Sequence, residues 1–234
     1  MSELLNPDDF VITRKRKKYK FAKFHNAENC FEFEEWRKQP VDVVELGAGT
    51  GLFSVELASR HPSKQFVAID VKADRLQKGA YEALERGIEN VRFVRARADQ
   101  IDDLFDEHSL EALWLTFPDP FPRVRSARRR MTHPIYLEKY ATLLRQGLTL
   151  NRGEKSESVF NGLCLKHDNN DFFQWSLEQL VEQGWRIDEI SFDLHDSNLS
   201  DDYKIQTTYE MRWLSEGLTT KFVRATKLKE SSKL

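Results

Sequence analysis

Residues Val41 to Gly51 read Val-Asp-Val-Val-Glu-Leu-Gly-Ala-Gly-Thr-Gly, a short valine-rich segment that runs straight into three alternating glycines. The segment 41–46 is brief and β-branched, which predicts a strand. The glycines allow a tight backbone turn and let a ligand approach the chain closely. Helical spacing follows over 52–60, and 65–70 again reads as a strand. This β-α-β unit predicts an α/β fold.

The alternation continues along the rest of the chain. It predicts helices over 73–86, 134–145 and 169–184, and strands over 91–95, 110–115, 158–165 and 185–192. We expect residues 207–227 to return to the edge of the sheet, and the polar stretch 151–157 to be a surface excursion. The pattern is typical of one doubly wound, mostly parallel sheet covered by helices.

The composition favours a single folded domain. The chain has 234 residues, of which 40% are hydrophobic and 32% charged. No apolar stretch reaches the length of a membrane span, so we expect a cytoplasmic protein. Cys30 and Cys164 share no metal-ligand spacing, which predicts no metal site and two inert thiols. Residues 1–40 mix charge and aromatics without a clear period, and we interpret them as an N-terminal arm before a domain of residues 41–230.

Two acids near the glycine turn indicate a nucleoside-bearing cofactor. Asp70 ends the second strand, 19 residues after Gly51, where a carboxylate can accept both hydrogen bonds from a ribose diol. The third glycine comes one residue too early for a dinucleotide fingerprint, and Glu45 would repel a pyrophosphate but suits a cationic ligand. Asp99, after the third strand, is the candidate for the adenine side. The alternative to a cofactor-binding turn is an ordinary glycine turn. The alternative for Asp99 is an acid in a loop that faces solvent.

A second constellation follows the fourth strand, where Pro118, Pro120 and Pro122 surround Asp119. Prolines fix φ and remove amide donors, so Asp119 should sit in a stiff loop suited to orienting a flat base. Behind it come five arginines: Arg123, Arg125, Arg128, Arg129 and Arg130. A second basic run at 13–20, with aromatics interleaved, favours a nucleic-acid partner. The alternatives are a plain turn with a surface acid and a solvated helix end.

Three motifs in this order resemble the bacterial tRNA (guanine-N(7)-)-methyltransferase family. They are the glycine turn 45–51, the segment 117–123 with Arg128 to Arg130 behind it, and the segment 193–199 leading to Thr207-Thr-Tyr-Glu210. The resemblance implies a seven-stranded class I methyltransferase fold, S-adenosylmethionine as cofactor and tRNA as partner, with no obligatory protein partner. The implied donor-binding residues are Glu45, Gly47, Gly49, Gly51, Asp70 and Asp99.

The same resemblance implies roles at the acceptor side. Asp119 matches the acid of the catalytic site. The implied substrate contacts are Arg123, Asp168, Thr207 and Glu210, and the implied phosphate contacts are Arg125, Arg128, Arg129 and Arg130. Guanine N7 has a free lone pair and needs no general base, so the expected work of these residues is positioning and charge stabilisation.

The chain departs from the family pattern at several positions. Arg97 stands where the family has its adenine-side Asp, Phe121 replaces a Trp, and Lys166-His167-Asp168 replaces a Thr-Asp pair. Two other functions therefore stay open. One is methyl transfer to another nucleic-acid position or a small molecule, and the other is RNA binding on a methyltransferase fold without activity.

Overall fold

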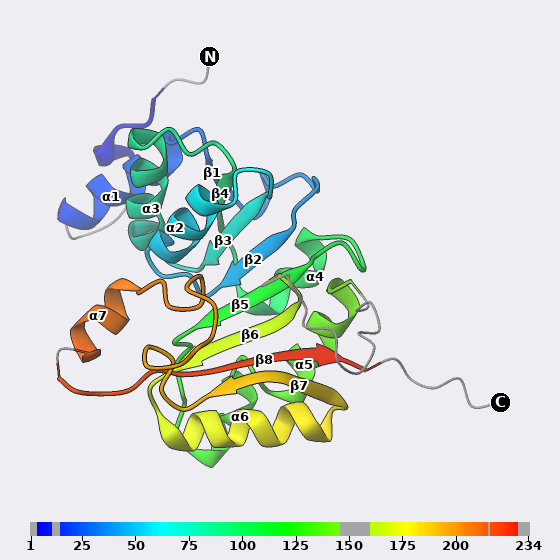
Figure 1. The fold of residues 1–234 in the computed structure, drawn as a ribbon. Helices are drawn as coiled ribbons and strands as arrows, with labels where there is room; N and C mark the ends of the chain where they lie inside the picture. Colours follow the sequence, from blue (N-terminus) through cyan, green and yellow to red (C-terminus); the bar gives the residue numbers. More distant parts are fainter. Residues whose placement is uncertain (1–3, 11–14, 146–159, 215, 229–234) are drawn as a thin grey trace. The chain divides into compact units, whose positions relative to one another are not determined.

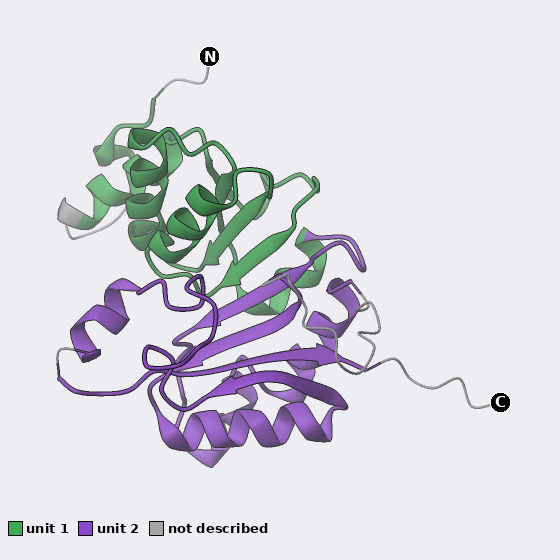
Figure 2. Ribbon diagram, viewed as in Figure 1, with its two compact units in different colours: residues 1–104 green, residues 105–234 purple. Residues whose placement is uncertain are grey.

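The computed structural model describes residues 4–10, 15–145, 160–214 and 216–228, so the predicted excursion at 151–157 lies outside the described residues. The chain divides into two compact units, Met1–Leu104 and Phe105–Leu234 (Figure 2). The strands are β1 (Cys30–Glu32), β2 (Val43–Leu46), β3 (Phe66–Asp70), β4 (Val91–Arg95), β5 (Ala112–Thr116), β6 (Gly162–His167), β7 (Trp185–Ser191) and β8 (Lys221–Lys227). The helices are α1 (Lys15–Asn26), α2 (Leu52–Arg60), α3 (Ala73–Glu85), α4 (Ile101–Leu104), α5 (Pro134–Leu143), α6 (Asn170–Glu182) and α7 (Thr208–Leu214) (Figure 1). Three 3-10 helices join them: η1 (Pro7–Asp9), η2 (Ala98–Gln100) and η3 (Val124–Arg129).

The first unit contains a wholly parallel run of strands in the order β1-β4-β3-β2. All four residues of β2 are buried, as are four of the five residues of β3. A strand buried on both faces reads as a continuous apolar run, which is why 41–46 and 65–70 were recognisable in the sequence. The predicted β-α-β unit and the parallel pairing are confirmed.

The first 40 residues contain more regular structure than the interpretation as an arm suggests. Helix α1 packs against α3, with Ala22 and Phe24 buried. Strand β1 pairs in parallel with β4, and Cys30 lies opposite Phe93. The described residues therefore hold eight strands instead of the expected seven. A strand of three residues is too short to give a readable alternation, so the sequence offered no signal for it.

The second unit has the strand order β5-β6-β8-β7. Strands β5 and β6 are parallel, whereas β8 runs antiparallel to both of its neighbours, β6 and β7. The expectation that 207–227 returns to the edge is therefore wrong, because β8 lies inside and β7 forms the edge. Two charged residues of this inner strand, Lys221 and Arg224, are buried, at 7% and 3% relative exposure.

Helices cover the sheet of the second unit, as expected for this α/β class. Helix α6 packs along β7 and β6 and begins after Asn169, whose side chain accepts a hydrogen bond from Phe172 N (Figure 1). Helix α5 begins after His133, with Pro134 at its first position. Within the described ranges, no helix is both long enough and apolar enough to cross a membrane.

Candidate functional site

The glycine turn of the first unit is held by a backbone network at the carboxyl end of β2. The amides of Gly47 and Ala48 both donate to the carbonyl of Ile69, at 2.8 and 2.9 Å. Gly47, Gly49 and Gly51 have φ of 77°, 58° and 71°. These left-handed values favour glycine, so the three residues are required by the shape of the turn itself.

Asp70 connects this turn to the next one. Its Oδ2 accepts from Gly49 N at 2.8 Å, and its Oδ1 accepts from Lys72 N at 2.8 Å. Burial raises the pKa of Asp70, although the two backbone donors and the nearby Lys72 and Arg75 act in the opposite direction. Each oxygen keeps a second lone pair, so the carboxylate is oriented and can still accept from a ligand.

Glu45 is nearly fully buried in β2, at 2% relative exposure. Its Oε2 accepts from the hydroxyl of Ser54, on α2, at 2.6 Å. The carboxylate is therefore fixed in orientation directly before the glycine turn. A carboxylate at this place supplies the negative charge that a cationic ligand needs.

Gly79, on α3, supports the turn and was missed by the sequence reasoning. Its amide donates to Thr50 O at 2.9 Å. A Cβ placed on Gly79 would lie 2.4 Å from that same oxygen, so only glycine allows α3 to approach the turn this closely. A small residue facing a glycine turn is the signal that could have found it.

The residues of this turn fit the cofactor that the sequence implies. A Cβ placed on Gly49 would meet no heavy atom within 4 Å, so the turn opens onto free space at that residue. The oriented Asp70 carboxylate suits a ribose diol, and the buried Glu45 carboxylate suits a ligand with ammonium and sulfonium charges. S-adenosylmethionine combines these groups.

Asp99 occupies a more exposed position than the other predicted donor-binding residues. Arg97 donates to both of its oxygens, from Nε at 2.9 Å and from Nη2 at 3.1 Å. The side chains are 65% and 52% exposed, so this ion pair contributes little to stability and can open at low cost. Arg97, where the chain departs from the family pattern, thus binds the carboxylate of Asp99, the residue predicted to face adenine.

In the second unit, Asp119 is exposed in the loop between β5 and η3. No hydrogen bond or ion pair engages its carboxylate within the described ranges, and Arg123 does not pair with it. Phe117 and Phe121, on either side, have φ of 51° and 39°. Left-handed backbone at such bulky residues costs about 1 kcal/mol or more each, so other contacts must hold the loop.

Asp168 follows the last residue of β6, and it is less exposed than Asp119. Its side chain is 16% exposed. The hydroxyl of Tyr209 donates to Oδ2 at 3.3 Å, and His167 Nδ1 lies 3.1 Å from Oδ1. Partial burial raises the pKa of Asp168, but the neighbouring His167 and the hydrogen bond from Tyr209 lower it further, so the pKa lies below its usual value. Because β5 and β6 are parallel, Asp119 and Asp168 both follow the carboxyl ends of these strands, on the same side of the sheet.

Thr207 and Glu210 form a capping box at the start of α7. Thr207 N donates to Glu210 Oε2 at 3.1 Å, and Glu210 N donates to Thr207 Oγ1 at 3.0 Å. Glu210 is buried, at 1% exposure, and pairs with Lys166, which is 0% exposed, at 2.8 Å. Its Oε1 accepts from Thr220 Oγ1 at 2.9 Å and contacts His195 Nε2 at 2.7 Å. A direct contact between Glu210 and a substrate would displace one of these partners.

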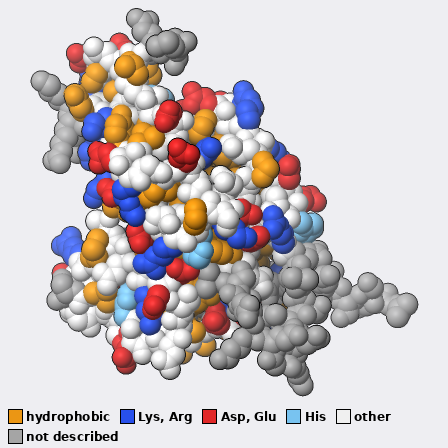
Figure 3. Space-filling model, turned by 45° about the horizontal axis from the view of Figure 1, so that its top comes forward, with side chains coloured by type: hydrophobic (Ala, Val, Ile, Leu, Met, Phe, Trp, Pro, Cys, Tyr) orange, Lys and Arg blue, Asp and Glu red, His pale blue; other side chains and the backbone are white. Residues whose placement is uncertain are grey.

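The five arginines after Asp119 fall into two groups. Arg123, Arg125, Arg128 and Arg129 are exposed, and Arg129 stacks on Phe121 at 4.4 Å. Arg130 is half-buried, lies 4.4 Å from the Trp175 ring, and donates to Pro120 O at 3.1 Å and to Phe121 O at 3.2 Å. Arg130 therefore holds the Asp119 loop, and the other four arginines expose positive charge to solvent. On the face drawn in Figure 3, basic and acidic side chains are interspersed.

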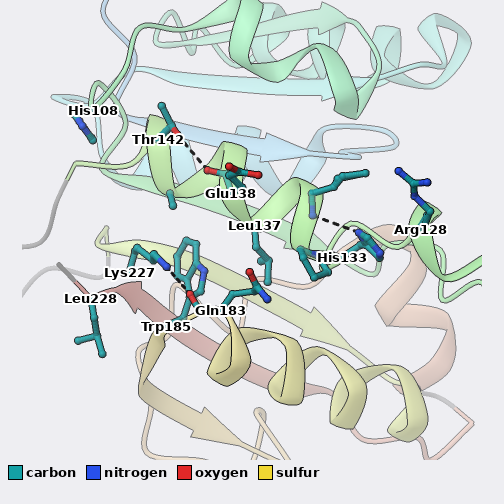
Figure 4. Close-up of a pocket in the computed structure, with 13 residues that line it drawn as sticks. His108, Arg128, His133, Leu137, Glu138, Thr142, Gln183, Trp185, Lys227 and Leu228 are labelled. Carbon is teal, nitrogen blue, oxygen red and sulfur yellow. Dashed lines mark hydrogen bonds between the residues drawn. The ribbon is translucent and has the colours of Figure 1, made fainter. Parts of the chain in front are cut away.

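A cavity of about 1030 Å³ lies elsewhere in the second unit, along α5 (Figure 4). Its lining includes His108, Arg128, His133, Trp185 and Lys227. Burial and the neighbouring Arg128 lower the pKa of His133. The cavity includes neither Asp119 nor Asp168, and of the predicted site residues only Arg128 reaches it.

Comparison with known proteins identifies the family of this chain. A family described as putative methyltransferase matches residues 39–223. The tRNA (guanine-N(7)-)-methyltransferase of Bacteroides fragilis is 33% identical over 231 residues, covering 90% of this chain and 85% of the relative. The enzyme of the same name from Brevibacillus brevis is 36% identical over 174 residues, covering 74% and 75%.

Solved structures agree on the fold. The 16S rRNA methyltransferase KamB superposes with a TM-score of 0.57 at 15% identity, covering 83% of this chain and 90% of that one. A 16S rRNA (adenine(1408)-N(1))-methyltransferase variant, solved with cosubstrate SAM, superposes with a TM-score of 0.53 at 14% identity, covering 98% and 95%. The α/β class I methyltransferase fold is confirmed, with the eighth strand as the difference.

The close approach of α3 to the glycine turn gives a first prediction. Gly79→Ala should push Thr50 away and weaken the binding of S-adenosylhomocysteine about tenfold, since overpacking costs about 1–3 kcal/mol. Isothermal titration calorimetry measures the change. Ala80→Gly, on the same helix and also buried, is the matched control and should lower stability while leaving the affinity unchanged. Equal affinities for Gly79→Ala and the wild type would contradict the supporting role.

The buried pair in the second unit gives another prediction. Glu210→Gln leaves the Lys166 ammonium buried without a counter-charge, so the free energy of unfolding should fall by about 3–5 kcal/mol. Urea denaturation measures this loss. Asp201→Asn, at an acid whose side chain is 92% exposed, is the control and should cost less than about 1 kcal/mol. A Glu210→Gln variant as stable as the wild type would show that the carboxylate does not hold the fold.

Proposed function

The chain belongs to the tRNA (guanine-N(7)-)-methyltransferase family, and we propose that it transfers a methyl group from S-adenosylmethionine to ring nitrogen 7 of a guanine in tRNA. The observation that carries this proposal is the pair of acids, Asp119 and Asp168, that follow the carboxyl ends of β5 and β6 in the second unit. Asp119 is exposed on a loop that Arg130 holds through Pro120 O, and the pKa of Asp168, directly after β6, is lowered. Such a pair suits a base that gains positive charge during the reaction.

On the donor side, the proposal assigns roles to residues of the first unit. Glu45 and Asp70 would hold the charged amino-acid part and the ribose, the backbone of Gly47, Gly49 and Gly51 would leave room for the ligand, and Asp99 would face adenine. S-adenosylmethionine would supply a methyl group on a sulfonium, a leaving group that needs no acid to activate it. This chain's residues therefore bind and orient the donor without moving a proton.

On the acceptor side, the reaction requires that the guanine be oriented and that its developing positive charge be compensated. Guanine N7 attacks with its own lone pair, and the base becomes cationic as the methyl group arrives. A carboxylate aimed at the base can accept from the N1–H and the exocyclic amine, and it stabilises the developing charge. We assign this role to Asp119, with Asp168 beside it and Arg123 as a further substrate contact. Thr207 and Glu210 would act by placing α7, whose Tyr209 contacts Asp168.

The partner and the place of action follow from the same proposal. We expect tRNA as the only required macromolecule, with no obligatory protein subunit, and we expect the enzyme to act in the cytoplasm. The relatives that match over most of their length are named as tRNA enzymes, which supports tRNA as the substrate. Donor binding and methyl transfer distinguish this proposal from an inactive RNA-binding protein on the same fold.

The proposal is tested by methylating unmodified tRNA with the purified chain alone. The expected product carries 7-methylguanine, mapped by borohydride–aniline cleavage and mass spectrometry. Methylation at another nucleoside would replace the proposed acceptor. Binding of tRNA without methyl transfer would favour the inactive module, and a lack of heat with S-adenosylhomocysteine would exclude the cofactor.

Asp119→Ala should lower kcat about 100-fold or more, because it removes the group that stabilises the developing charge. Its affinity for S-adenosylhomocysteine should stay unchanged. Single-turnover methylation and calorimetry measure the two quantities. Asp171→Ala, at an exposed acid in the first turn of α6, is the control and should keep full activity. Normal turnover by Asp119→Ala would exclude the assigned role.

The exposed arginines should contact phosphates. Replacing Arg123 and Arg125 by Gln should weaken tRNA binding and reduce the slope of log K against log salt by about 1–2 units. Arg60→Gln with Arg86→Gln removes the same charge from the first unit, where both residues pair with Glu56, and serves as the control. Filter binding at several salt concentrations measures the slopes. Identical slopes for the two double variants would mean that the charge near Asp119 has no special place in RNA binding.

A further inference from the structure

His167, the last residue of β6, connects the two acids of the acceptor side. It is 3% exposed. Its Nε2 lies 2.9 Å from the carbonyl oxygen of Pro118, the residue directly before Asp119. A carbonyl oxygen can only accept, so Nε2 must carry the hydrogen of this bond. The imidazole thereby ties the end of β6 to the Asp119 loop.

The other nitrogen of the ring faces the neighbourhood of Asp168. Asn169 N donates to Nδ1 at 2.9 Å, and Asp168 Oδ1 lies 3.1 Å from the same atom. The ring packs between Phe172, with ring centroids 4.5 Å apart, and Phe117, at 6.1 Å. Packing and hydrogen bonds together fix the orientation of the imidazole.

The Asp119 loop needs such a contact because its backbone is strained. Phe117 and Phe121 both adopt left-handed φ without being glycine. Arg130 holds the far side of the loop through Pro120 O and Phe121 O. His167 holds the near side through Pro118 O. Asp119 thus lies between two fixed carbonyl groups.

We propose that His167 is a positioning residue that fixes the Asp119 loop next to Asp168. The proposal deepens the proposed function and rests on it for the reaction, but the fixation of the loop is a separate statement about the protein alone. His167 belongs to the Lys166-His167-Asp168 segment at which this chain departs from the family pattern. The acceptor site would therefore depend on an imidazole that is absent from the Thr-Asp pair of the family pattern.

Three variants separate the hydrogen bond to Pro118 from the packing of the ring. His167→Phe keeps the ring and removes both nitrogens. His167→Asn keeps a polar atom near Nδ1 but is too short for Pro118. His167→Gln places its amide nitrogen near Nε2 and can still donate to Pro118 O. His108→Phe removes another histidine contact to a carbonyl in the same unit, that of Leu144 at 3.1 Å, and serves as the control.

The first readout is trypsin cleavage after Arg123 and Arg125, which needs no activity. His167→Phe and His167→Asn should be cut faster than the wild type under conditions where thermal unfolding shows all variants folded. His167→Gln and His108→Phe should be cut at the wild-type rate. Equal cleavage of all five proteins would overturn the proposal, whether or not the chain methylates tRNA.

The second readout is steady-state methylation. His167→Phe and His167→Asn should lower kcat about 10- to 100-fold, as expected for a displaced reacting group, with an unchanged affinity for S-adenosylhomocysteine. His167→Gln should recover most of this loss. A failure of the wild type to methylate tRNA would contradict the proposed function alone, because the cleavage pattern decides on the loop. Unchanged kcat in His167→Phe, with the wild type active, would overturn the positioning role.

Discussion

The buried ion pair between Lys166 and Glu210 organises the second unit. Lys166 belongs to β6, and Glu210 belongs to α7, 44 residues later. Lys166 also donates a hydrogen bond to Ile205 O. Glu210 also accepts a hydrogen bond from the hydroxyl of Thr220 and contacts His195. A buried carboxylate and ammonium are costly to remove from water, so each is stable only while the other is in place. The pair therefore fixes α7 and the approach to β8 in one step. Tyr209, carried by α7, can then reach Asp168.

The donor side of the first unit is built by a different principle. Here the backbone itself fixes the site, because main-chain hydrogen bonds and the Asp70 carboxylate hold the turn of Gly47 to Gly51. Gly79 allows α3 to pack directly against it. Such a turn leaves few side chains free to vary. It is also local, since its parts follow one another along the chain, which explains why the sequence predicted it well.

Features that depend on distant contacts were harder to predict. Strand β1 has only three residues, and the position of β8 between β6 and β7 follows from pairing that no periodicity encodes. Thr207 and Glu210 show the same limit. The sequence motif implied substrate contacts for both residues, but the fold places them in a capping box with Glu210 buried against Lys166. The sequence singled out His167 only as part of the segment 166–168 that departs from the family pattern, because a histidine after an apolar strand is compatible with many roles.

Burial divides the acids of the acceptor side into three kinds. Glu210 is fully buried and saturated by donors, Asp168 is partly buried and has a lowered pKa, and Asp119 is exposed on a loop that is fixed by its backbone. A carboxylate stabilises a developing cation best when it is already oriented but not yet neutralised by a partner. Glu210 fails the second condition, while a carboxylate on an unsupported loop would fail the first. Asp119 meets both, because the prolines and the bonds to Pro118, Pro120 and Phe121 hold its backbone and leave its side chain free to meet a base.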